Sequence, residues 1–448
     1  MDELLQSVFE AGVVGCGGAG FPTHVKLNCK PEYLLVNGVE CEPMLRTDRH
    51  VMLAHAEELV EAAGNIAVRL GNPRCIFVLK DSYKEEIRSL NAAISAKGAK
   101  IELCLASSFY PAGDEQAVVF EATGRVVPPA GLPLDVGCVV INAATLFAVG
   151  NAVRGQAFIH KYLTVSGAVH APSVLCVPVG TSFADCIAAC GGATVKEYII
   201  IAGGPLMGRR MTAGEAAGEC VGKTTSGILL LPAEKAGLRR FSLEQMKNRA
   251  RASCIQCTYC TELCPRHLLG HPIEPHKIMR KLAYASDIEA LLTEPEIANA
   301  LLCCECGVCE IYACPMGLQP RSVNAYLRKE LAKKGIRYSK GAGQTPVSED
   351  REYRKTPSRR IAERAGVGEY YSVCKADDCI AVNPQVVRLL LKQGAGSPSQ
   401  PVIQSGERVK EGQLIAKCPE GALGANLHAS ISGIATVSAD SIRIVGDQ

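Results

Sequence analysis

The chain has 448 residues, of which 48% are hydrophobic and 21% are charged, and its formal net charge is +3. This length exceeds what one hydrophobic core serves and predicts about three domains, while the nearly balanced charge gives no reason to expect a nucleic-acid partner. The acidic start MDELLQSVFEAG lacks the features of a signal peptide, and no apolar run reaches the roughly 18 residues of a membrane span. We therefore expect a cytoplasmic protein without a direct membrane span.

The sequence of the first half of the chain predicts two structural domains. Residues 1–155 alternate short apolar strands such as YLLVNG, RCIFVLK and CVVINAA with helical stretches such as DSYKEEIRSLNAAISAKG. That alternation is typical of an α/β domain with a mainly parallel sheet. Residues 156–225 place the short strands YLTVSGAV and EYIIIAGG around the small helix SFADCIAACGG, which indicates a compact α+β module.

The second half predicts three further segments. Residues 241–335 are expected to form helices between cysteine clusters, including SLEQMKNRA and PRSVNAYLRKELAKKG. Residues 336–371 are polar and basic, which is the composition of a linker or a mobile surface loop. Residues 372–448 are rich in Val, Ile, Gly and Ser with short alternations, and this pattern predicts a small β module.

The chain contains 22 cysteines, and nine of them fall between Cys254 and Cys314. In a large chain without a secretion signal, such clustering indicates metal or redox chemistry and not a disulfide scaffold. The scattered cysteines are interpreted as small buried apolar residues.

Eight of the clustered cysteines form two similar motifs. The first follows C-x2-C-x2-C-x3-C and ends before Pro265, while the second has one more residue in its last gap and ends before Pro315. This is the spacing of bacterial ferredoxins, in which the fourth cysteine of each motif ligates the other motif's 4Fe-4S cluster. The predicted ligand sets are Cys254, Cys257, Cys260 and Cys314 for one cluster, and Cys303, Cys306, Cys309 and Cys264 for the other.

Two alternatives accompany this interpretation. Cys304 lies inside the second motif but breaks its spacing, so it is interpreted as a packed thiol that binds no iron. Pairs of CxxC also build tetrahedral zinc sites, which remain the competing interpretation of the whole set. Two four-cysteine motifs that each end in Cys-Pro favour iron-sulfur clusters.

A glycine-rich stretch, GVVGCGGAGFPTHVKL, precedes the first predicted strand. Glycines let backbone amides approach a phosphate or a flavin ring closely. The stretch fits neither the dinucleotide-binding G-x-G-x-x-G context nor the P-loop pattern, so by itself it is equally well a plain turn.

The stretch GGAGFPTHVKL is followed in order by LLVNGVECEP, YPAGDEQ and VINAATLFAVGNAV. In this series the first 155 residues resemble the FMN- and NADH-binding domain of the complex I flavoprotein subunit and of RnfC. The resemblance implies an FMN and nicotinamide site formed by Gly15, Gly17, Gly18, Gly20, Lys26, Asn37, Glu40, Glu42, Tyr110, Gly113, Asp114, Glu115, Asn142 and Thr145. Asp114 and Ala143 depart from the complex I pattern, in which Glu and Asn are usual.

Some of these residues also have plainer interpretations. The alternative interpretation of the acidic residues is a solvated loop, and that of Lys26 is a surface lysine. Phe21 either stacks on a nicotinamide or fills the domain core.

The remaining modules resemble parts of the same family. VSGAVHAPSVLCVPVGTSFADCIAACGG with IAGGPLMG resembles a soluble-ligand-binding β-grasp (SLBB) module, for which a purely structural role is the alternative. GERVKEGQLIAKCPEGALGANLHASISGIATV resembles a barrel-sandwich hybrid domain, and it lacks the hairpin lysine of a carrier domain. RnfC places the barrel-sandwich domain ahead of the flavin domain, whereas this chain places it last. This order of modules, together with both cysteine motifs, closely resembles that of cobalamin reductases of the PduS type.

The resemblance implies an enzyme that takes electrons from NADH through FMN and two 4Fe-4S clusters to a corrinoid. Its implied partners are cobalamin, a corrinoid adenosyltransferase, and a bacterial microcompartment shell or other electron-transfer proteins, and its implied location is the interior of a propanediol-utilisation microcompartment. The alternatives are an RnfC-type subunit of a membrane ferredoxin:NAD oxidoreductase and a non-enzymatic electron-transfer scaffold.

Overall fold

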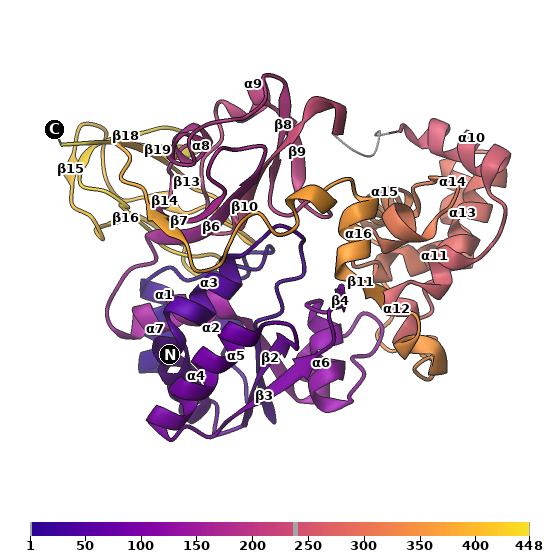
Figure 1. Cartoon of the computed structure of the whole chain (residues 1–448), viewed down its shortest axis with the longest axis horizontal. Coiled ribbons are helices and arrows are strands. Elements are labelled where there is room, and N and C mark those ends of the chain that lie inside the picture. The colour runs from indigo at the N-terminus through magenta and orange to yellow at the C-terminus, as the bar shows by residue number, and fades with distance from the viewer. Residues whose placement is uncertain (1, 236–240, 448) are drawn as a thin grey trace.

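The computed structural model describes residues 2–235 and 241–447. Figure 1 shows an α/β unit at the bottom, a mixed β unit above it, a small β unit at the left and a helical unit at the right. The predicted fold class, which combines a complex I flavoprotein-like domain, a β-grasp module, a helical cluster domain and a barrel-sandwich module, is confirmed.

The α/β unit is built on a four-stranded parallel sheet of order β3-β2-β1-β5. Its strands are β1 (Tyr33–Asn37), β2 (Arg74–Lys80), β3 (Ile101–Ala106) and β5 (Cys138–Asn142), and β4 (Phe109–Tyr110) lies outside the sheet. Its helices are α1 (Glu3–Glu10), α2 (Thr23–Lys26), α3 (Thr47–Ala54), α4 (Ala56–Arg69), α5 (Lys84–Lys97), α6 (Glu115–Thr123), η1 (Pro133–Val136) and α7 (Ala143–Val153). Strands β1, β2 and β5 are apolar on both faces because helices cover both sides of the sheet.

The β-grasp unit contains a six-stranded mixed sheet of order β12-β7-β6-β10-β8-β9. It comprises β6 (His160–Gly167), β7 (Ser173–Pro178), α8 (Phe183–Ala189), β8 (Tyr198–Ala202), β9 (Arg209–Thr212), α9 (Ala213–Ala216), β10 (Gly227–Pro232) and η2 (Ala233–Lys235). The edge strand β12 (Cys379–Ala381) comes from much later in the chain and pairs in parallel with β7. The C-terminal part of the chain therefore completes this sheet.

The helical unit contains both cysteine motifs. Its elements are α10 (Leu243–Ser253), α11 (Tyr259–Glu262), α12 (Pro265–Leu268), α13 (Pro275–Tyr284), α14 (Ile288–Leu292), η3 (Pro295–Leu302), η4 (Val308–Ala313) and α15 (Pro320–Lys333). Helices α10, α13 and α15 bury one apolar stripe each, including Met246, Ile278 and Leu327. The helices thus form a core of their own, which holds the cysteine loops at one end of the bundle.

Residues 336–371, which were predicted to be a linker or a mobile surface loop, contain four short elements that pack against other units. They contain η5 (Glu349–Glu352), β11 (Thr356–Pro357), α16 (Ser358–Arg364) and η6 (Gly368–Tyr370). Strand β11 pairs with β4 of the α/β unit, and Arg351 forms a 2.6 Å ion pair with Glu121 with both side chains largely buried. The polar side chains that indicated a linker are used in these contacts, and the segment holds the helical unit against the α/β unit (Figure 1).

The C-terminal unit packs two small sheets of order β13-β19-β18-β15 and β14-β16-β17 around a shared core. Its strands are β13 (Val386–Leu390), β14 (Gln400–Pro401), β15 (Arg408–Val409), β16 (Leu414–Lys417), β17 (Leu427–His428), β18 (Gly433–Val437) and β19 (Ser441–Gly446).

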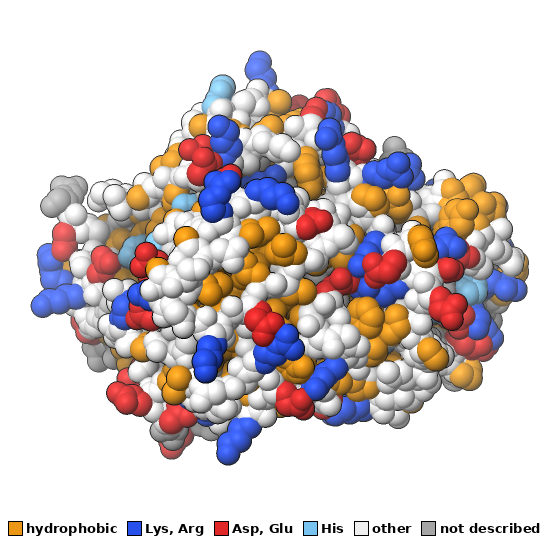
Figure 2. All heavy atoms as spheres, turned by 60° about the horizontal axis from the view of Figure 1, so that its bottom comes forward, with side chains coloured by type: hydrophobic (Ala, Val, Ile, Leu, Met, Phe, Trp, Pro, Cys, Tyr) orange, Lys and Arg blue, Asp and Glu red, His pale blue; other side chains and the backbone are white. Residues whose placement is uncertain are grey.

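The surface mixes charges of both signs. Figure 2 shows basic and acidic side chains interspersed over one face, in keeping with the small net charge. Within the described ranges, no helix is both long and apolar enough to cross a membrane.

Lys223 lies where three of the units meet. Its side chain is fully buried, and its ammonium donates to the carbonyl oxygens of Gly12 at 2.7 Å and Asn426 at 2.8 Å. Burial lowers the pKa of Lys223 to about 7. The neighbouring His428 is also buried, and this burial, with the nearby Lys223, lowers its pKa to about 4.

We expect the junction to become more stable as the pH rises from about 7 towards 10. The pKa of Lys223 is lowered in the folded protein, so in this window the unfolded chain binds a proton that the folded chain has released. The free energy of unfolding therefore rises with pH. Melting temperatures measured at pH 7 and pH 9 should show a smaller rise for Lys223→Met than for the wild type or the exposed control Lys417→Met. An equal rise in all three proteins would contradict this prediction.

Candidate functional site

The glycine-rich loop runs from α1 to α2 beside the start of α7. A bridge between Val14 and Pro22 closes the loop, and the amide of Cys16 donates to the hydroxyl of Thr145 at 2.8 Å. Gly18 has φ +124° with open space around its Cα. A Cβ on Gly20 would lie 2.6 Å from Gly394 of the C-terminal unit, so this glycine permits close contact between two units. Contacts at Val14, Cys16 and Pro22 thus hold the loop in place, while the space around Gly18 stays open.

Two asparagines mark the carboxyl ends of neighbouring strands. Asn37 and Asn142 are paired in register at the ends of β1 and β5. The chain continues from β1 to β2 on one side, while β5 lies on the other side, so ligands are expected in the crevice at this edge. Asn142 caps α7 by accepting from the amide of Thr145, and Asn37 donates to the carbonyl of Gly113 at 3.0 Å. These contacts bring the glycine loop, both asparagines and Gly113 together at the strand ends where the crevice is expected.

The loop from Tyr110 to Glu115 closes the other side of this crevice. Gly113 has no room for a side chain, because a Cβ there would lie 2.2 Å from the carbonyl oxygen of Val39. Glu115 forms a 2.6 Å ion pair with Lys26, and both side chains are partly exposed. A phosphate or flavin ring could compete for this lysine, which is placed on the open side of the loop.

Tyr110 and Asp114 connect this crevice to the cysteine motifs. The buried hydroxyl of Tyr110 donates to the carbonyl of Cys306 at 2.8 Å. Asp114 caps α6 and forms a 2.8 Å ion pair with Arg266, and both of these side chains are at least 85% buried. Direct contacts therefore join the crevice to the second cysteine motif.

The structure brings the eight motif cysteines into two groups around separate cavities. The grouping is the crossed one: Cys254, Cys257, Cys260 and Cys314 line one cavity, and Cys264, Cys303, Cys306 and Cys309 line the other. Within the described ranges, no three Cys, His, Asp or Glu side chains are close enough to hold a single metal ion. Four thiols around a cavity are the donor set and arrangement that a 4Fe-4S core needs.

Cys304 lines the second cavity as well but is engaged elsewhere. Its thiol interacts with that of Cys306 and with the buried guanidinium of Arg266. The hydrogen bond with Cys306 is the largest of the effects that lower the pKa of Cys304 to about 7. This position fits the interpretation of Cys304 as a neighbour of the cluster and leaves its absence from the ligand set a prediction.

Comparisons with known proteins match every unit of the chain. Residues 8–151 match the Nuo51 FMN-binding domain, 162–210 the SLBB domain, 253–319 the 4Fe-4S dicluster domain and 378–442 the RnfC barrel-sandwich hybrid domain. Cobalamin reductase PduS of Citrobacter freundii is 40% identical over 99% of this chain and 96% of its own length, and that of Salmonella typhimurium is 38% identical over the same shares. The chain belongs to the PduS family of cobalamin reductases.

More distant relatives share part of the chain. One component of the proton-translocating ferredoxin:NAD(+) oxidoreductase complex of Clostridium ljungdahlii is 37% identical, over 59% of this chain and 56% of its own length. The RnfC-type alternative is therefore less supported than PduS membership. This PduS family member is an electron-transferring oxidoreductase with FMN and 4Fe-4S domains.

Two acidic residues predicted for the flavin site are used in other contacts. Glu40 is buried, accepts from the amides of Thr47 and Asp48, and has its pKa raised to about 8, chiefly by burial. Glu42 accepts from the amides of Leu206 and Met207 in the β-grasp unit, and burial raises its pKa to about 7. In this PduS family member Glu40 therefore holds the chain after β1 in place, and Glu42 joins that strand end to the β-grasp unit. Direct contact of either residue with a cofactor remains a prediction.

Phe21 is 37% exposed at the glycine loop, which argues against the interpretation that it fills the core and leaves stacking on a ring as the other interpretation. Two residues of the site were not predicted. Asp48 accepts from the side chain of Asn142 at 2.7 Å, and Arg266 pairs with Asp114. The position of Arg266 directly after Cys264-Pro265 was the available signal in the sequence, whereas Asp48 stands in an ordinary helical stretch and gave none.

Proposed function

We propose that this PduS family member passes electrons from NADH through FMN and two 4Fe-4S clusters to a corrinoid. The observation that carries the proposal is the direct contact between the crevice and the second cysteine group, made by the hydroxyl of Tyr110 and the carbonyl of Cys306. FMN, when bound, accepts a hydride from NADH and releases electrons one at a time, which clusters accept. The protein's task is to hold these groups close together and to tune them.

We infer specific roles for the residues around the crevice. The open tip at Gly18 offers backbone amides, and Gly113 lets the opposite loop lie flat against the strand end. Lys26 supplies a positive charge for the flavin, and Asn37 and Asn142 fix the two sides of the crevice. The full proposed site remains Gly15, Gly17, Gly18, Gly20, Lys26, Asn37, Glu40, Glu42, Tyr110, Gly113, Asp114, Glu115, Asn142 and Thr145.

The two crossed cysteine groups are the proposed cluster ligands. The second group lies next to the crevice, whereas the first is lined by Ile255 and Met316, which are 61% and 40% exposed. Electrons would therefore enter at the second cluster and leave at the first. The proposed recipient is cobalamin, alone or on a corrinoid adenosyltransferase, inside a propanediol-utilisation microcompartment.

Anaerobic purification followed by NADH titration tests this proposal. We expect about eight irons and one FMN per chain, with both the flavin and the cluster absorbance bleached by NADH. The bleached protein should then reduce hydroxocobalamin. Iron without flavin, or flavin that NADH leaves oxidised, would favour the electron-transfer scaffold over the enzyme.

Lys26→Met provides a sharper test of the crevice. Removing the ammonium should weaken FMN retention about tenfold, because a charge-assisted contact is lost while iron content stays unchanged. FMN content after gel filtration is the measurement, with Lys30→Met as the control on the same loop. Unchanged flavin retention in Lys26→Met would show that the lysine is a surface residue that serves only the pair with Glu115.

A further inference from the structure

A large cavity lies where the α/β, β-grasp and C-terminal units meet. Its volume is about 870 Å³, within the range of small-molecule sites. Helices α1 and α7, strand β6 and the C-terminal unit all contribute to its walls. None of the residues predicted for the flavin and nicotinamide site lines it. The cavity lies at the junction of three units and borders the glycine loop, because Cys16 and Ala144 line it.

The most unusual residue in its wall is Lys161 on β6. The residue is only 2% exposed, and its side chain lines the cavity. Asp48 is near enough for the two charges to interact, but its carboxylate is hydrogen-bonded to Asn142 and to the amide of Ala144. An ammonium in the wall of a cavity can donate charge-assisted hydrogen bonds to an incoming anion, so this position is suited to a ligand with acceptor oxygens.

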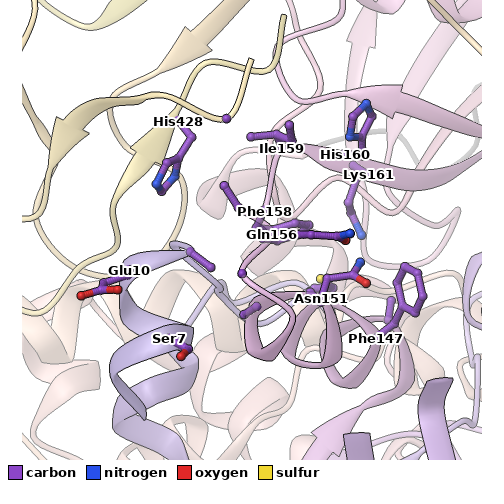
Figure 3. A pocket seen from close by; sticks show the side chains of 18 of the residues that line it. Ser7, Glu10, Phe147, Asn151, Gln156, Phe158, Ile159, His160, Lys161 and His428 are labelled. Atoms are coloured by element: carbon purple, nitrogen blue, oxygen red, sulfur yellow. The ribbon is translucent and has the colours of Figure 1, made fainter. Parts of the chain in front are cut away.

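Two amide side chains accompany Lys161. Figure 3 shows Gln156, Asn151 and Lys161 with their polar ends directed to the same part of the cavity. The oxygen of Asn151 accepts from Arg154 at 2.6 Å, which leaves its amino group free to donate. One ammonium and two amide groups can thus donate to several oxygens of one anion.

The rest of the cavity is suited to an organic body. Phe147, Phe158 and a row of alanines on α7 supply apolar walls beside the polar end. At the far end, His428 is 7% exposed and its Nδ1 has no hydrogen-bond partner among the described residues. Figure 3 shows this ring directed into the cavity opposite Lys161.

We propose that this cavity is a binding site for an organic phosphate, with the phosphate oxygens at Lys161, Asn151 and Gln156. Three donors, on α7, on the loop that follows it and on β6, match the three terminal oxygens of a phosphate monoester better than a carboxylate with two. The body of the ligand lies along α7 and reaches His428. Because the walls come from three units, ligand binding also holds those units together.

The test is calorimetric titration of the holoprotein, with its FMN and iron quantified, using AMP, ribose 5-phosphate and inorganic phosphate as probes. AMP and ribose 5-phosphate carry the same terminal phosphate monoester on a nucleoside and on a sugar, so they distinguish two sources of the same chemistry, and inorganic phosphate binding as tightly as both would contradict a role for the organic body. We expect at least one of the two to bind, and Lys161→Met to weaken that binding about tenfold or more. Lys196→Met, at an exposed lysine of the same unit, should bind like the wild type.

Asn151→Leu serves as a second variant if Lys161→Met does not fold, and it should weaken binding in the same direction. Absence of binding by both organic probes, or equal binding by the wild type and the variants, would overturn the proposal. Loss of FMN from Lys161→Met would also overturn it, because the lysine would then belong to the flavin site. Bleaching of the flavin by NADH reports on the proposed function independently of all these outcomes.

Discussion

Replacing Cys306 with serine is expected to remove about four of eight irons, whereas replacing Cys304 with serine is expected to remove none. The two cysteines line the same cavity and differ by two positions, so the pair makes a matched comparison. Cys306 keeps the x2 spacing to Cys303 and Cys309, and its carbonyl accepts from Tyr110. Cys304 breaks that spacing, and its thiol interacts with the guanidinium of Arg266.

Iron and sulfide assays on anaerobically purified proteins measure this difference, and electron paramagnetic resonance of the reduced proteins identifies the cluster that is lost. In Cys306→Ser the surviving signal should be that of the cluster held by Cys254, Cys257, Cys260 and Cys314. Equal loss of iron in Cys304→Ser would make Cys304 a ligand. Retention of all iron in both variants would show that Cys304 can replace Cys306.

The cysteine grouping could be predicted from the sequence because it depends on local spacing. Three cysteines at x2 intervals must lie on one short loop, and a Cys-Pro pair ends each motif. The structure places the fourth cysteine of each motif beside the opposite loop, as the ferredoxin pattern implies. The parallel strands could also be predicted from the sequence, because strands buried on both faces form continuous apolar runs.

Contacts between units could not be predicted in the same way. Residues 336–371 have the composition of a linker, yet Arg351 and Lys355 both pair with Glu121, which is 230 positions away from Arg351. Nothing near these basic residues in the sequence identifies their partner. The partner of Glu42 was equally unpredictable, since its motif predicts a flavin contact while its carboxylate accepts hydrogen bonds from the β-grasp unit. Polarity indicates that a side chain needs a partner, and only the folded chain determines which one.

Opposite changes at Asp114 and Arg266 should shift the potential of the adjacent cluster in opposite directions. The two side chains form a buried ion pair between the flavin crevice and the second cysteine group. Asp114→Asn leaves the guanidinium charge uncompensated, which stabilises the reduced and more negative cluster and raises its midpoint potential. Arg266→Gln removes the positive charge and therefore lowers the midpoint potential of the same cluster. A single charge this close in a partly dry interior gives shifts on the order of 50 mV.

Redox titration monitored by electron paramagnetic resonance measures both midpoint potentials in each variant. The cluster of the first cysteine group is the internal control, because neither side chain lines its cavity and its potential should move much less. A purely structural role for the pair would shift both variants in the same direction or broaden both signals. Shifts of opposite sign, confined to one cluster, can arise only if the pair acts through its charges. That result would show that the ion pair of Asp114 and Arg266 tunes the potential of the second cluster through its charges.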